Sequence, residues 1–216
     1  MLKDSIAYVD INSFGDNTTQ ELRDTLTQLL KQNPKGIVID LRNNPGGYLS
    51  TAVEVTSEFI EDGVVLYEQY GDGRRDQYEA LGNGQATDIP LVVLINEGSA
   101  SASEILAGAL QDYERAKLVG VQSYGKGTVQ NRVPLSNDQG AASVTIAKWL
   151  TPKEREIEHV GLTPDVYVES DPQLVNTDND PQIQAAVETL NAILNGTVIP
   201  TSQPTSSPVP TLTPVN

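Results

Sequence analysis

Short apolar runs alternate with expected helices along most of this chain. The segments Gly36–Leu41 and Pro90–Asn96 are almost continuously apolar and rich in β-branched residues, which is typical of parallel strands buried on both faces. A strand at Ile6–Ile11 and a helix from Thr18 come before them, and further helices are expected over 50–60 and 101–114. Because strands that alternate with helices need crossover connections, a parallel sheet is predicted.

The pattern changes after residue 114. Strands are predicted at Leu118–Gln122, Thr128–Leu135 and Ser143–Leu150, separated by turn residues, so this part is expected to be antiparallel or mixed. Val64–Tyr70 is expected to be a strand of the alternating series, and residues 71–84 a turn-rich excursion. The predicted fold is α/β, with a mixed, largely parallel central sheet flanked by helices and an additional antiparallel section.

The carboxyl-terminal part divides into a helix and a tail. Asp180 followed by Pro181 is a favourable helix start, so a last helix is predicted over Pro181–Leu194. Residues 195–216 are mostly Thr, Ser, Pro and Val with almost no charge, which indicates an unstructured linker or stalk. We therefore expect one folded domain over 1–194 and a disordered tail over 195–216.

Composition excludes several function classes. A formal net charge of −15 argues against a nucleic-acid or anionic-membrane surface. The chain has no cysteine, which excludes thiol catalysis, disulfides and Cys-type zinc sites, and His159 is its one histidine. No metal or cofactor is expected. Apolar runs such as Leu91–Ile95 fall far short of the ~20 residues of a membrane span.

Three stretches carry candidate catalytic chemistry. Ser101 stands where a helix is expected to begin, and the helix dipole and free N–H groups there favour developing negative charge, although Ser-x-x-Glu with Glu104 also fits a simple cap. Gly46 and Gly47 follow a buried strand and can present N–H groups to an oxyanion, or form an ordinary turn. Lys126 could serve as a neutral base for the serine or be a surface lysine.

One further match is rejected. Ser123 and Lys126 satisfy Ser-x-x-Lys, the signature of penicillin-binding enzymes. In those enzymes the serine begins a helix and a Lys-Thr-Gly motif accompanies it, whereas this chain has no Lys-Thr-Gly. The match is therefore taken as coincidence.

The motifs together resemble those of the carboxyl-terminal processing peptidases, also called tail-specific proteases. The resemblance rests on Asp40–Gly47, Gly98–Ile105, Tyr124–Gln130 and Gly161–Val166, and it extends from about Ile6 to Leu194. It implies a crotonase- or Clp-protease-like core and a serine endopeptidase that cleaves near the carboxyl termini of proteins.

The resemblance also implies roles for individual residues. Ser101 corresponds to the nucleophile, Lys126 to the general base and Gln130 to the residue that orients the lysine. The oxyanion hole corresponds to the N–H of Ala102 and a glycine N–H, for which Gly47 is preferred and Gly46 is second. The implied partners are the tails of protein or peptide substrates and no nucleic acid, with a homo-oligomer left open.

The chain departs from the family pattern at its start. Members typically carry an amino-terminal region and a PDZ domain before the first strand, and the residues ahead of Ile6 are too few to form a PDZ domain, so a catalytic-core fragment is expected. The resemblance implies an extracytoplasmic location, although Met1–Asp4 shows no secretory signal. Three alternatives stay open: a non-enzymatic peptide-binding scaffold, a core that is inactive without its PDZ domain, and an esterase or acyl transferase that uses the same groups.

Overall fold

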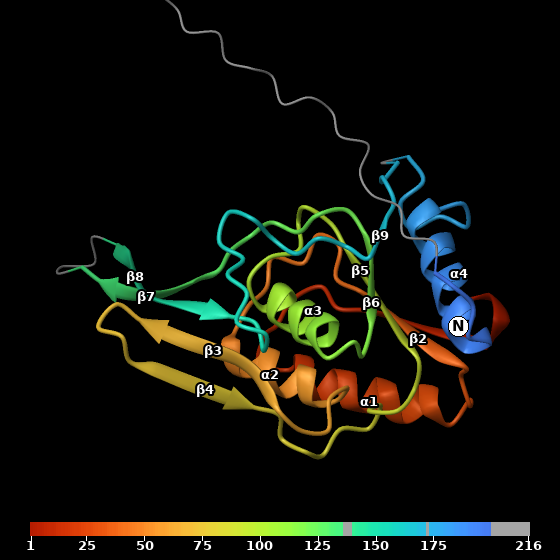
Figure 1. Cartoon of the computed structure of the whole chain (residues 1–216), viewed down its shortest axis with the longest axis horizontal. Helices are drawn as coiled ribbons and strands as arrows, with labels where there is room; N and C mark the ends of the chain where they lie inside the picture. Colours follow the sequence, from red (N-terminus) through yellow and green to blue (C-terminus); the bar gives the residue numbers. More distant parts are fainter. Residues whose placement is uncertain (136–139, 172, 200–216) are drawn as a thin grey trace, which may run out of the picture.

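A parallel sheet lies at the centre of the chain (Figure 1). In the computed structural model, which describes residues 1–135, 140–171 and 173–199, this sheet has five strands. In spatial order they are β1 (Ile6–Asp10), β2 (Gly36–Asp40), β5 (Leu91–Ile95), β6 (Lys117–Gly120) and β9 (Val166–Tyr167). Every neighbouring pair is parallel, as the crossover argument predicts.

The sheet is covered on both faces, because alternate residues of its strands enter two different cores. Ile37 and Ile39 of β2 pack into a cluster with α1 (Thr18–Leu30), α2 (Leu49–Ser57) and α3 (Ala102–Asp112). Val38, between them, packs on the other face with α4 (Pro181–Asn195). Figure 1 shows α4 on the side of the sheet away from α3. This two-sided burial explains the continuous apolar runs in the sequence.

A second sheet is antiparallel and stands beside the helices α2 and α3 (Figure 1). Its strands lie in the order β4 (Arg75–Glu79), β3 (Val64–Tyr70), β8 (Ala141–Leu150) and β7 (Thr128–Pro134). A short 3₁₀ helix, η1 (Lys3–Ser5), precedes β1. None of the helices in the described ranges has the length and apolar character needed to cross a membrane.

The α/β class and the separate antiparallel section are confirmed, and several details of the prediction are wrong. Val64–Tyr70 belongs to the antiparallel sheet, because it pairs with β4 and β8 rather than with β2 or β5. Residues 71–84 contain the strand β4. The strand predicted at Leu118–Gln122 is β6 of the parallel sheet, where it ends at Gly120, and β9 was not expected.

The last helix is confirmed, with one residue more than predicted. Asp180 caps it as expected, since its carboxylate accepts hydrogen bonds from the N–H groups of Gln182 and Ile183. Asn195 ends α4 and Gly196 caps it in a left-handed conformation, so the helix includes the first residue of the predicted tail. Residues 200–216 of that tail lie outside the described residues.

Candidate active site

The candidate segments leave the sheet from the carboxyl ends of three neighbouring strands. β2 leads into the turn 41–48, β5 into the loop 96–101, and β6 into the loop 121–127. Because parallel strands that lie side by side end at the same edge, the three segments meet there. The edge is the usual place for a ligand site in an α/β fold.

Ser101 is the N-cap of α3 and has an unusual backbone conformation. Its φ is 55° and its ψ is −115°, a region that residues with a side chain rarely adopt. Ser101 and Glu104 form a capping box, in which the Glu104 side chain accepts a hydrogen bond from the N–H of Ser101 at 2.9 Å. The N–H of Ala102, the first residue of α3, has no acceptor in its own helix.

Glu104 connects the serine to the lysine loop. Its side chain is fully buried, and Oε2 accepts hydrogen bonds from the backbone N–H groups of Ser101 and Lys126, each at 2.9 Å. The two nitrogens can therefore lie no further apart than twice 2.9 Å. Oε1 accepts a bond from the N–H of Gly125 at 2.7 Å and another from the hydroxyl of Ser123. One buried carboxylate thus sets the separation of both backbone segments.

The sequence predicted only part of this arrangement. The spacing of Ser101 and Glu104 indicated the capping bond, but no local signal indicated the bonds to residues 123–126. Ser123 is buried, and its Oγ also accepts a hydrogen bond from the N–H of Leu162 at 2.7 Å. Its hydroxyl is therefore engaged on both sides, in agreement with the rejection of Ser123 as a nucleophile.

The backbone around Lys126 is fixed on its other side as well. The indole N–H of Trp149 donates to the Lys126 carbonyl at 3.0 Å, and the backbone N–H of Trp149 donates to the Gly127 carbonyl at 2.9 Å. The N–H of His159 binds the Gly125 carbonyl, while the His159 side chain is 90% exposed. The lysine side chain is half-buried and has no hydrogen bond or ion pair within the described ranges.

The glycine turn lies directly against the serine. The Asn44 carbonyl accepts hydrogen bonds from the N–H of Ala100 at 3.0 Å and the hydroxyl of Ser103 at 2.9 Å. A Cβ atom on Gly46 would lie 2.8 Å from both the Ala102 nitrogen and the Ser101 Cβ, which shows how close the turn comes.

The two glycines of the turn differ in whether their N–H group is free. The Gly46 N–H donates to the Asn44 side chain at 2.9 Å. The N–H of Gly47 has no acceptor among the described residues. Its neighbours are both bonded to Phe14: the Gly46 carbonyl accepts from the Phe14 N–H, and the Tyr48 N–H donates to the Phe14 carbonyl. Of the two candidate oxyanion donors, Gly47 is therefore the one with an available N–H.

Gln130 is the candidate that the geometry does not connect to the others. It lies on β7 opposite Thr145, its side chain is exposed, and that side chain has no hydrogen bond among the described residues. Over the described ranges, no group of three or more His, Asp or Glu side chains is arranged to hold a metal ion.

A serine at a helix start beside backbone N–H groups is an arrangement that serine-type peptidases use for nucleophilic attack and oxyanion binding. The chain belongs to peptidase family S41, whose family model matches residues 5–168. Part of that model's range, residues 136–139, lies outside the described residues.

Named relatives agree with this membership. The chain is 41% identical over 190 residues to the carboxyl-terminal-processing protease of Synechocystis sp., covering 86% of this chain and 44% of that protein. It is 41% identical over 176 residues to the chloroplastic C-terminal processing peptidase of Tetradesmus obliquus, covering 82% and 37%. A solved photosystem II D1 C-terminal processing protease matches with a TM-score of 0.73 and 36% identity, covering 88% of this chain and 48% of that one. The chain thus spans less than half the length of these proteins.

Proposed function

We propose that this protein is a serine endopeptidase that cleaves near the carboxyl termini of other proteins. Family S41 membership and the names of the relatives support the reaction type and the region cleaved. The observation that carries the proposal for this chain is the carboxylate oxygen of Glu104 that Ser101 and Lys126 share. It holds the backbone of the nucleophile candidate next to that of the base candidate.

Each candidate residue has a role in the proposed reaction. Neutral Lys126 takes the proton of the Ser101 hydroxyl as Oγ attacks the peptide carbonyl carbon. The N–H groups of Ala102 and Gly47 donate to the oxyanion that forms. Lys126 returns the proton to the leaving amine, and water then hydrolyses the acyl-enzyme. Gln130 is proposed to orient the lysine once substrate is bound.

The proposed substrates are extended carboxyl-terminal tails. Such a segment can bind by adding a strand to a sheet edge, and β7, which directly follows the lysine loop, is an edge strand among the described residues. We also propose an extracytoplasmic location for the protein, in line with the family resemblance. Fractionation of the source cells would contradict this location if the protein were recovered with the cytosol.

The decisive test uses casein, an unstructured protein, with the parent chain and its Ser101→Ala and Lys126→Arg variants. Arginine keeps the positive charge and much of the length of lysine but does not give up its proton, so it cannot act as a base. Lys31→Ala, at an exposed site at the end of α1, is the matched control. Mass spectrometry of the products locates the cut relative to the carboxyl terminus.

The expected result is cleavage by the parent and the Lys31 variant, and none by the two site variants. A Lys126→Arg protein as active as the parent would contradict the base role. An inactive parent would favour a peptide-binding scaffold or a core that needs a further domain. Hydrolysis of an activated ester without cleavage of casein would favour the esterase alternative.

A further inference from the structure

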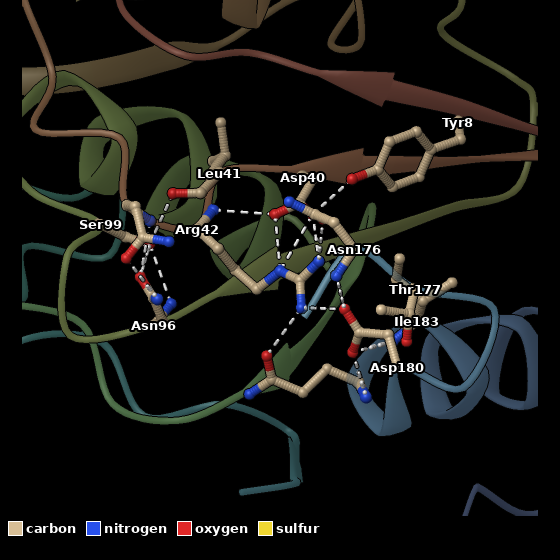
Figure 2. A network of polar contacts seen from close by, with 12 residues as sticks. Tyr8, Asp40, Leu41, Arg42, Asn96, Ser99, Asn176, Thr177, Asp180 and Ile183 are labelled. Atoms are coloured by element: carbon tan, nitrogen blue, oxygen red, sulfur yellow. Dashed lines mark hydrogen bonds and ion pairs between the residues drawn. The ribbon is translucent and has the colours of Figure 1, made fainter. Parts of the chain in front are cut away.

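Arg42 is a buried cation at the start of the glycine turn, and each N–H of its guanidinium group has an acceptor (Figure 2). Its acceptors are the side chains of Asp40, Asn176, Asp180 and Gln182. Asp40 is two residues away, but Asp180 is 138 residues further along the chain. A planar guanidinium held from both sides has one orientation.

The carboxylate of Asp180 serves two structures at once. Oδ1 caps α4 by accepting the N–H groups of Gln182 and Ile183. Oδ2 accepts the Arg42 Nη1–H at 2.8 Å and the N–H of Asn176 at 2.9 Å. Burial raises the pKa of Asp180, but the hydrogen bonds from the Asn176 N–H and the Arg42 guanidinium lower it by more. The net shift of the pKa is therefore downward.

The residues that follow Arg42 hold the nucleophile loop. The N–H of Asn43 donates to the Asn96 side chain at 2.8 Å, and the Asn44 carbonyl accepts from Ala100 and Ser103 on either side of the serine. The N–H of Gly47, which has no acceptor among the described residues, lies in the same turn. A shift of Arg42 therefore moves both the oxyanion donor and the loop that carries Ser101.

We propose that Asp180 is a positioning residue of the candidate active site, which it holds in working geometry through Arg42 and the turn 43–47. The inference rests on the proposed function where it concerns the reaction rate. Asp180 lies beyond residues 5–168, the range matched by the family model. A segment outside that range therefore helps to hold Arg42, and with it the glycine turn, in place. The competing account is that Asp180 only anchors α4.

The test compares Asp180→Asn with a control that weakens α4 elsewhere. Asparagine is as good a helix cap as aspartate but carries no charge for Arg42. Leu190→Ala removes a fully buried side chain of α4 that packs against the sheet beside Gly36, at the opposite end of β2 from Arg42. For each protein, kcat and KM on a peptide substrate, the thermal midpoint, and amide hydrogen exchange of residues 43–47 and 99–103 are measured.

We expect Asp180→Asn to lower kcat by about 10- to 100-fold with KM within about twofold, since small displacements in a catalytic site have effects of this size. Exchange at residues 43–47 should rise, because the amides of Asn43, Asn44 and Gly46 lose fixed partners. Leu190→Ala should lower the thermal midpoint while leaving kcat of the folded protein and exchange at the turn unchanged.

Two results would overturn the inference. One is an Asp180→Asn protein with the exchange and kcat of the parent. The other is a Leu190→Ala protein that changes exchange at the turn and kcat as strongly, because the effect would then follow helix stability alone. An inactive parent whose Asp180→Asn variant still shows faster exchange at 43–47 would count against activity of this chain by itself and would support the positioning role.

Discussion

Replacing Glu104 by Gln puts an NH₂ group into a site that is surrounded by donors. At Oε2 both neighbours are backbone N–H groups, from Ser101 and Lys126, and neither can reverse its role. At Oε1 the Ser123 hydroxyl can turn to accept, but the N–H of Gly125 cannot. The amide is therefore expected to place its NH₂ where Oε1 stood and to leave the Gly125 N–H without an acceptor.

The cost follows from these contacts. A hydrogen bond to a charged group contributes about 1.5–3 kcal/mol, and a buried donor without an acceptor costs about 1–3 kcal/mol. The variant loses the hydrogen bond to Gly125, and its bonds to Ser101 and Lys126 no longer involve a charged acceptor. Together these changes should lower the free energy of unfolding by about 2–5 kcal/mol. Because domains typically have about 5–15 kcal/mol of stability, the variant should fold with a loosened lysine loop. Its activity on casein should fall by about 100-fold.

Trp149 supplies the assay. It is the only tryptophan of the chain, it is buried, and its indole N–H binds the Lys126 carbonyl, so its fluorescence reports on the lysine loop during urea denaturation. The matched control is Glu58→Gln. Glu58 is also fully buried and accepts bonds from Arg23 and the N–H of Gln85, at the end of α2 away from the glycine turn.

The control variant should lose stability but keep the activity of the folded protein. The reasoning is refuted if Glu104→Gln and Glu58→Gln have the same activity and the same native fluorescence. In that case the Glu104 carboxylate would contribute to stability without setting the geometry of the site.

Three further predictions concern single residues. In Gly47→Ala the added Cβ would lie 2.1 Å from the Phe14 carbonyl oxygen at a φ of 155°, so casein cleavage should be lost; parent-like cleavage would contradict this. Trp149→Phe leaves the Lys126 carbonyl without its indole donor and should cost about 1–3 kcal/mol by urea denaturation followed by circular dichroism, and a cost near zero would count against it. Despite burial, the pKa of Asp180 is lowered in the folded protein by its N–H and guanidinium donors. Below about pH 4 the unfolded chain therefore binds more protons than the folded one, so the stability that ionised Asp180 contributes above that pH is lost as acid is added. Asp180→Asn should therefore flatten the pH dependence of the urea midpoint below about pH 4, and an unchanged slope would refute the linkage.

Local sequence patterns predicted most of the elements, but not all their partners. Gly36–Asp40 and Leu91–Ile95 were predictable because burial on both faces leaves a continuous apolar run. The helix at Pro181–Asn195 was predictable from its cap. Arg75–Glu79 was missed because it is polar and alternately exposed, so only its pairing with β3 makes it a strand. Val64–Tyr70 was assigned to the wrong sheet because a strand does not encode which edge it joins.

The same division holds for the candidate site. The sequence by itself determined which chemical groups are available: a serine at a helix start, two glycines after a buried strand, and a lysine between glycines. It also identified the family, because four motifs in one order are specific where each alone is not. Local patterns could do this because helix starts, turns and buried strands depend on residues close together in the chain.

The tertiary structure decided which of these groups meet. The bonds of Glu104 to the lysine loop join residues 19 to 22 positions apart, and the ion pair of Arg42 with Asp180 joins residues 138 apart. It also decided that the Gly46 N–H is taken by the Asn44 side chain, whereas the Gly47 N–H has no acceptor among the described residues. Such pairings depend on strand order and on the directions in which loops leave the sheet, so only the folded chain can select the acceptor for each donor.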